Sequence, residues 1–195
     1  MKTTFKNSIL KIYLANSKLI FYNIRFNQTF KINLKGVWQV TAYSIDFAEK
    51  LASTALDVIT DGLIDVASVQ TVIYLSLLST EISLKAMLEQ AGMNLKDIRS
   101  CSHDISKLIK ALDRCKISVN SNIVSAGQLR SKKIAYLNTS KTVGAIVDTD
   151  PNTQSNYPSQ IRYGDSFISH PPVVMAEVVS VVLKFAKKHW HDIHI

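Results

Sequence analysis

Apolar side chains recur at helical spacing from residue 44 onward. One buried helix face is expected from four residues spaced three or four positions apart: Phe47, Leu51, Ala55 and Val58. Ser44 is a suitable N-terminal cap, and Asp61 and Gly62 follow the pattern, where glycine supplies the left-handed residue that ends many helices. The pattern therefore predicts a first helix from Ser44 to about Asp61.

A second helix is predicted from Leu63 to about Ala91, where Gly92 ends it. Its apolar residues cover nearly every face of the helix: Val72, Ile73, Tyr74, Leu75, Leu77, Leu78, Ile82, Leu84, Ala86 and Leu88. A helix that is apolar all round belongs in the middle of a bundle. Asp65 and Glu81 interrupt its most apolar window, so we do not expect this helix to span a membrane.

A third helix is predicted from Ser102, as its cap, to about Lys116, after a connection over residues 93–101. At about 100° per residue, one face is apolar: Ile105, Leu108, Ile109 and Leu112. The opposite face carries basic residues: His103, Lys107, Lys110 and Arg114. The pattern therefore predicts a helix with one buried face and one basic, outward face.

Residues 118–165 show the least regular pattern and are rich in Ser, Asn, Thr and Asp. Two short helical pieces are predicted there, at 123–137 and 141–147, followed by a loop over 148–160. The prolines in Ser169-His170-Pro171-Pro172 then mark the first turn of a last helix that runs to about Lys188. His189, His191 and His194 follow it, and we interpret them as a frayed surface end rather than a metal site.

The first 40 residues differ from the rest in charge and in pattern. Seven basic and no acidic residues precede Asp46, whereas the remainder holds 16 basic against 15 acidic residues. Apolar and polar residues alternate over 24–34 with a break at Asn27-Gln28, so this extension forms either a short hairpin or a poorly ordered basic arm. We expect a basic N-terminal extension over 1–40 and an all-α, antiparallel bundle of about five helices over 41–195.

The cysteine content and the lack of known catalytic motifs argue against a metal site and a bound cofactor. The two cysteines, Cys101 and Cys115, match no metal-ligand spacing and are interpreted as free thiols, which favours a cytoplasmic location. The chain has no glycine-rich phosphate loop, no Gly-x-Ser-x-Gly elbow and no paired-cysteine zinc motif. We therefore expect no cofactor and no bound metal.

Four features could carry chemistry. Residues 93–133 hold nine basic against three acidic side chains and form either a phosphate-binding surface or a solvated outer face. Glu81 and Lys85 are spaced for an i, i+4 ion pair, or for the lining of a polar pocket between the second and third helices. The other two features are His103-Asp104 at the head of the third helix and Arg162-Tyr163 before the last helix.

These features together resemble the HEPN (higher eukaryote and prokaryote nucleotide-binding) domain superfamily. The resemblance rests on the order Glu81-x-x-Leu84-Lys85-Ala86, Gly92, His103-Asp104-x-x-x-Leu108 and Arg162-Tyr163 over residues 42–190. It implies a homodimeric helical bundle that binds nucleotide or RNA at a cleft between helices and does not bind a membrane. It also implies a nucleotidyltransferase or antitoxin as partner, in a toxin–antitoxin or phage-defence system. The ligand-binding residues expected on this basis are Glu81, Lys85, His103, Asp104, Arg162 and Tyr163. The basic face of the third helix adds Lys107.

Two alternatives remain open. The resemblance also includes metal-independent ribonucleases that carry an arginine and a histidine separated by four to six residues. Here Arg162 and His170, the catalytic candidates, are separated by seven residues, and Arg99 and His103 by three. This departure favours binding over cleavage, and a purely protein-interacting subunit is the third hypothesis.

Overall fold

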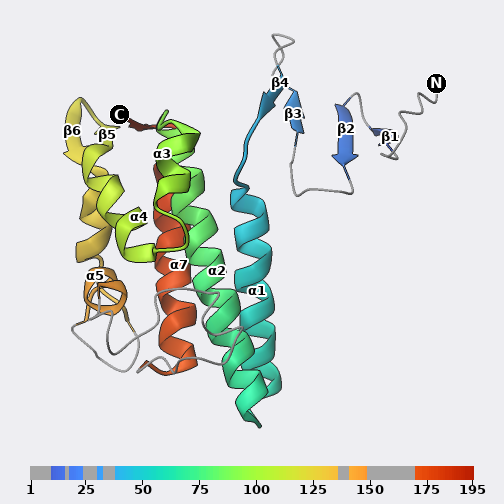
Figure 1. Cartoon of the computed structure of the whole chain (residues 1–195), viewed down its shortest axis with the longest axis vertical. Helices are drawn as coiled ribbons and strands as arrows, with labels where there is room; N and C mark the ends of the chain where they lie inside the picture. Colours follow the sequence, from blue (N-terminus) through green and yellow to red (C-terminus); the bar gives the residue numbers. More distant parts are fainter. Residues whose placement is uncertain (1–9, 16–17, 24–29, 33–37, 136–140, 149–169) are drawn as a thin grey trace. The chain divides into compact units, whose positions relative to one another are not determined.

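The structure, a computed structural model, describes residues 10–15, 18–23, 30–32, 38–135, 141–148 and 170–195 (Figure 1). The chain divides into two compact units, Met1–Ser44 and Ile45–Ile195.

Unit 1 contains two antiparallel strand pairs. β1 (Leu10–Ala15) pairs with β2 (Lys18–Asn23), and β3 (Phe30–Ile32) pairs with β4 (Trp38–Val40). The hairpin expected across Asn27-Gln28 stays a prediction, because its turn and first strand lie outside the described residues; β3, within its expected second strand, pairs with β4 downstream. Alternation identifies a strand, but it does not say which strand is its neighbour.

Unit 2 is predominantly helical and is built on three long helices. They are α1 (Ile45–Asp61), α2 (Val66–Gln90) and α7 (Pro172–Lys188). α2 packs against both of the others, and α1 also contacts α7. The sequence predicted all three, and their ends follow local chemistry: the Asp65 carboxylate accepts the Ser68 N–H at 2.6 Å, and Gly62 takes a φ of +103°.

The long helices do not simply alternate in direction. α1 runs antiparallel to α2, whereas α7 runs in the same direction as α2 (Figure 1). The chain ends agree with this arrangement, because the Ile195 N–H, beyond α7, donates to the Ala91 carbonyl at the end of α2 at 3.0 Å. The expected antiparallel bundle is therefore corrected for α7, since the elements between α2 and α7 return the chain to its starting end.

The segment after α2 is made of short elements. They are α3 (Leu95–Ser100), α4 (Ile105–Ala111), the 3₁₀ turns η1 (Leu112–Arg114) and η2 (Ala126–Ser131), strands β5 (Lys116–Val119) and β6 (Asn122–Ser125), and α5 (Val143–Val147). The predicted connection over 93–101 thus contains a helix, and the predicted 102–116 helix is shorter. The piece expected over 123–137 begins in strand β6 and contains the 3₁₀ turn η2, and its end lies outside the described residues. The piece expected at 141–147 is α5.

A small sheet makes the all-α prediction incorrect. Its strand order is β6-β5-β7, where β7 (Ile193–His194) comes from the C-terminal end of the chain. In β5 the exposed Lys116 and Ser118 flank Ile117, which is fully buried. The C-terminal histidine segment is therefore not a frayed end, because β7 pairs with β5 and His189 is buried.

α2 forms the centre of unit 2. Among the described residues, α2 is the one helix that is long and apolar enough to cross a membrane. In its most apolar 18-residue stretch, 72% is buried within the protein. Its buried residues run from Val72 to Leu88 and include polar ones. Burial against α1, α7, α3 and α4 accounts for its apolar character on nearly every face.

Candidate functional site

A buried ion pair lies in the middle of α2. Glu81 is 3% exposed and Lys85 is 6% exposed, and the Lys85 Nζ lies 2.7 Å from Glu81 Oε1. Spacing by four residues places both side chains on one helix face, as the sequence predicted. Because burying a charge is costly, this pair is retained only where its charges have partners.

His103 completes a cluster with this pair. Its Nδ1 lies 3.0 Å from Glu81 Oε1 and 3.2 Å from Oε2, although 22 residues separate the two in sequence. A carboxylate can only accept hydrogen bonds. Nδ1 therefore carries a proton and donates a hydrogen bond to Glu81. The other ring nitrogen, Nε2, is then an acceptor when the ring is neutral and a donor when it is protonated, and the side chain is 56% exposed.

The turn between α3 and α4 positions His103. Ser102 precedes it with a φ of +55°, so Ser102 lies in the turn and is not the helix cap that the sequence predicted. Asp104 is the cap, because its side chain accepts the Lys107 N–H at 3.0 Å. Ile105 is fully buried and fixes the first turn of α4 next to α2.

Lys107 lies one turn further along α4. Its Nζ is 3.4 Å from the Asp104 carboxylate, and its side chain is 64% exposed. Because the lysine end of this pair is solvated, the pair contributes little to stability, on the order of 0.5 kcal/mol, and the lysine can turn to another anion. Asp104 and Lys107 therefore flank the Glu81–Lys85–His103 cluster, on the same helix start that carries His103.

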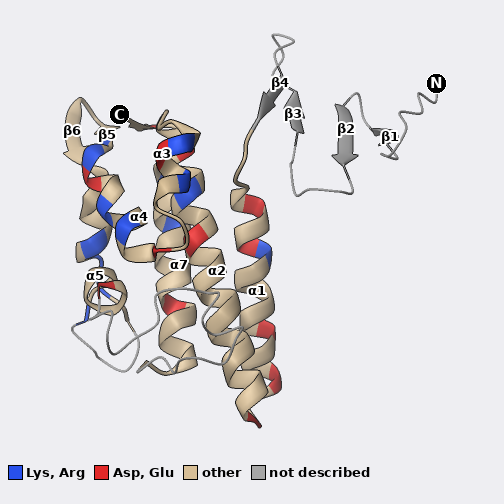
Figure 2. Cartoon of the chain, viewed as in Figure 1, with Lys and Arg blue, Asp and Glu red and all other residues tan. Residues whose placement is uncertain are grey.

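Exposed basic side chains lie on the elements that precede and follow His103 in the sequence. Lys and Arg are concentrated on the α3, α4, β5 and η2 side of unit 2 (Figure 2). Six exposed members of this basic face lie between α3 and β5: Lys96, Arg99, Lys107, Lys110, Arg114 and Lys116. The apolar side chains on the opposite face of α4, Ile105, Leu108 and Ile109, are fully buried, so the two-faced pattern predicted from the sequence is confirmed there.

A second polar cluster was missed by the sequence analysis. Asp148, at the end of α5, forms an ion pair with Arg130 of η2 and accepts a hydrogen bond from Ser106 Oγ of α4 at 2.7 Å. These contacts join three short elements that are distant in sequence. Arg130 is therefore engaged within the protein, and only its isolated basic charge was visible in the sequence.

Of the remaining candidate residues, His170 is described by the structure, and Arg162 and Tyr163 are not. His170 lies just before α7, and burial, followed by the charge of Lys141, lowers the pKa of its ring. Within the described part of the chain, its Nε2 is buried without a hydrogen-bond partner. Arg162 and Tyr163 lie outside the described residues, so their expected place beside His103 stays a prediction.

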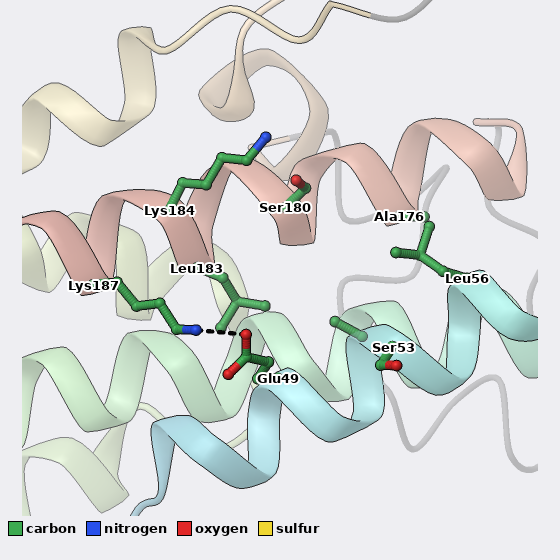
Figure 3. A pocket seen from close by; sticks show the side chains of 9 residues that line it. Glu49, Ser53, Leu56, Ala176, Ser180, Leu183, Lys184 and Lys187 are labelled. Carbon is green, nitrogen blue, oxygen red and sulfur yellow. Dashed lines mark hydrogen bonds and ion pairs between the residues drawn. The ribbon is translucent and has the colours of Figure 1, made fainter.

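A groove lies elsewhere, between α1 and α7 (Figure 3). Its volume is about 260 Å³, and Leu56 and Leu183 contribute to its apolar floor. At one end Lys187 forms an ion pair with Glu49. The groove contains none of the residues that the sequence analysis selected.

Metal binding and similarity to known proteins give no further guidance. The described residues contain no group of three His, Cys, Asp or Glu side chains that could hold a metal ion. Comparison with protein-family models, with curated proteins and with solved structures finds no match for this chain. Any function for this chain is therefore inferred from the geometry around Glu81 and His103.

Proposed function

We propose that unit 2 binds nucleotide or RNA phosphate at His103 and the basic face beside it, as the resemblance to HEPN domains implies. The observation that carries the proposal is the contact between the buried Glu81 carboxylate and His103 Nδ1. A carboxylate that holds one imidazole nitrogen fixes the orientation of the ring and leaves the other nitrogen for a ligand. This arrangement suits a histidine that meets a ligand better than an incidental surface histidine.

The chemistry of the surroundings favours an anionic ligand. Lys107, on the next turn of α4, and Arg99, at the end of α3, are both exposed. A protonated His103 donates from Nε2 to a phosphate oxygen, while the ammonium and guanidinium groups neutralise the phosphate charge. The resemblance adds Arg162 and Tyr163 to the same ligand, the first to phosphate and the second to a base.

Salt-dependent binding tests the proposal. Affinity for a single-stranded RNA oligomer and for ATP is measured against salt for the wild type, for His103→Ala, and for Lys107→Ala combined with Arg162→Ala. Each lost phosphate contact reduces the slope of log affinity against log salt by about 0.7 for a single strand, and we expect affinity to fall about tenfold or more.

A matched control is available on α1. Lys50→Ala removes an exposed lysine that lies on a long helix away from the basic face, and it should leave the salt slope nearly unchanged. Equal loss in Lys50→Ala and in the double variant would indicate a general charge effect. Unchanged binding in both His103→Ala and the double variant would reject the site.

A ribonuclease is the second candidate, favoured by the surroundings of His170. Burial lowers the pKa of this histidine, which keeps the ring neutral and suitable as a general base near neutral pH. Cleavage of an RNA oligomer in the presence of a chelator, lost in His170→Ala and in Arg162→Ala, would support cleavage with these residues. Binding without cleavage by the wild type would leave only the binding function.

A further inference from the structure

The small sheet of unit 2 has an open edge at β6. The strand order is β6-β5-β7, so within the described structure β6 has a neighbour on one side only. All four residues of β6 are exposed, and Ile123 is 64% exposed. An edge strand presents a row of backbone donors and acceptors that can pair with another extended chain.

The hydrogen-bonding register identifies the groups at this edge. In an antiparallel pair, successive residues of a strand point their backbone groups alternately toward and away from the neighbour. The Ala126 N–H donates to the Cys115 carbonyl at 2.8 Å, which places the even-numbered residues of β6 toward β5. Ile123 therefore points its N–H and C=O to the open edge and Ser125 points its N–H there, while the Ser125 C=O caps the first turn of η2.

Apart from its short length, β6 lacks the features that usually protect an edge. Natural edge strands carry charged residues, proline or a bulge that discourage pairing. β6 reads Asn-Ile-Val-Ser, with no charge and no proline, and its pairing with β5 is regular over all four residues. Exposed, β-branched Ile123 on such an edge is a site for a partner strand rather than a protected surface.

Charge near the strand selects the kind of partner. Lys116 lies directly opposite Ser125 in the β5–β6 ladder, and Arg114 of η1, which β6 contacts, is also exposed. Lys132 and Lys133 follow shortly after β6, whereas Asp113 is the one acidic residue from 112 to 133. The Lys132 ammonium lies over the Phe185 ring of α7, 6.0 Å from its centroid, so Lys116 and Arg114 are the cations that flank β6.

We propose that β6 binds an extended, acidic peptide segment of a partner protein as a fourth strand of the sheet. Backbone hydrogen bonds from Ile123 and Ser125 supply affinity, and the neighbouring cations select carboxylates at alternate positions of the peptide. A second copy of this chain is a poorer occupant, because pairing of two β6 strands would bring two basic flanks together. The interaction does not involve His103 or Glu81, although Arg114 and Lys116 also belong to the basic face.

Two peptides and two variants test the proposal. The probes are acetylated, amidated hexapeptides with three Glu-Val repeats or three Lys-Val repeats. Ile123→Pro removes an N–H that points to the open edge and leaves the β5–β6 bonds in place. Ile123→Thr keeps both the N–H and the β-branched shape and serves as the matched control.

The wild type should bind the acidic peptide about tenfold or more tightly than the basic peptide, measured by fluorescence anisotropy of labelled probes. Ile123→Pro should weaken binding about tenfold, and Ile123→Thr by less than about threefold. In the wild type, the acidic peptide should also slow hydrogen exchange at the Ile123 and Ser125 amides, a readout that does not depend on how any variant folds.

Three outcomes would overturn the proposal. They are binding of neither peptide, equal binding of both peptides, and no added protection at the Ile123 and Ser125 amides. Concentration-dependent self-association of the wild type that Ile123→Pro abolishes would assign the edge to a second copy instead.

Discussion

The three long helices and the short-element segment from Leu95 to Ser131 are built on different principles. α1, α2 and α7 are 17, 25 and 17 residues long, and they bury apolar faces against one another. The short-element segment contains two short helices, two 3₁₀ turns and two strands, and its exposed side carries most of the basic face. Both regions bury apolar side chains, and the short-element segment adds polar contacts between its elements, such as those of Ser106 and Arg130 with Asp148.

The two regions meet at the charged residues of α2. Glu81 is buried in a largely apolar helix, and its partner outside α2 is His103, from the turn between α3 and α4. The long helix thus supplies a rigid carboxylate, and the short-element segment supplies the exposed ring. Each prediction below separates a contribution of one region from a contribution of the other.

The largest effect should come from the apolar core of the long helices. Leu84 of α2 is fully buried, so Leu84→Ala should lower the free energy of unfolding by about 2–5 kcal/mol through lost contacts and a cavity. Leu56→Ala, at a residue that is 51% exposed on α1, should change it by less than about 1 kcal/mol. Urea denaturation measures both, and similar losses in the two variants would contradict the assigned core.

A slightly smaller effect should follow from disturbing the buried ion pair. Lys85→Met removes the ammonium that lies 2.7 Å from the Glu81 carboxylate, and should lower the free energy of unfolding by about 3 kcal/mol. The double variant Glu81→Leu with Lys85→Met should recover much of that loss, since no buried carboxylate remains. Additive losses in the double-mutant cycle would show that the two side chains are not coupled.

Within the short-element segment, Asp148 should matter less. Asp148→Ala removes the partner of Arg130 and of Ser106, and because all three are partly exposed we expect a loss of about 1–2 kcal/mol. Hydrogen exchange should accelerate in α5 and η2 and remain slow in α2. Asp57→Ala, at an exposed site on α1, is the control, and uniform acceleration throughout unit 2 would contradict a local role.

The smallest effect concerns pH and the junction at the end of α7. Burial, with Lys188 and Lys132 nearby, lowers the pKa of His189, and Asp192 opposes this only in part. The folded protein then prefers the neutral ring, so stability is retained above the unfolded pKa of about 6.5 and falls as pH decreases from there toward the folded pKa.

His189→Phe tests this junction. The substitution keeps an aromatic ring against Phe185, whose centroid lies 4.7 Å from that of His189, and should flatten the decline in melting temperature below pH 6.5. An unchanged pH profile in His189→Phe would assign the decline to other groups. His191→Phe, at an exposed position, serves as the control.

The sequence by itself determined the long helices and the polar pair within α2. Their apolar spacing, the Asp65 cap and the glycines after α1 and α2, Gly62 and Gly92 with φ of +103° and +92°, all act within a few residues. Spacing by four residues likewise brings Glu81 to Lys85. Such features can be predicted from the sequence because each depends on residues close to it in the chain.

Only the tertiary structure decided the rest. Ile123 and Val124 lie in a strand rather than the predicted helix because β5 is their neighbour, and β5 itself pairs with β7 from the far end of the chain. His103 meets Glu81 across 22 residues because α4 packs on α2. Strand partners and the partners of buried charges are chosen by packing between distant segments, and local pattern does not specify that choice.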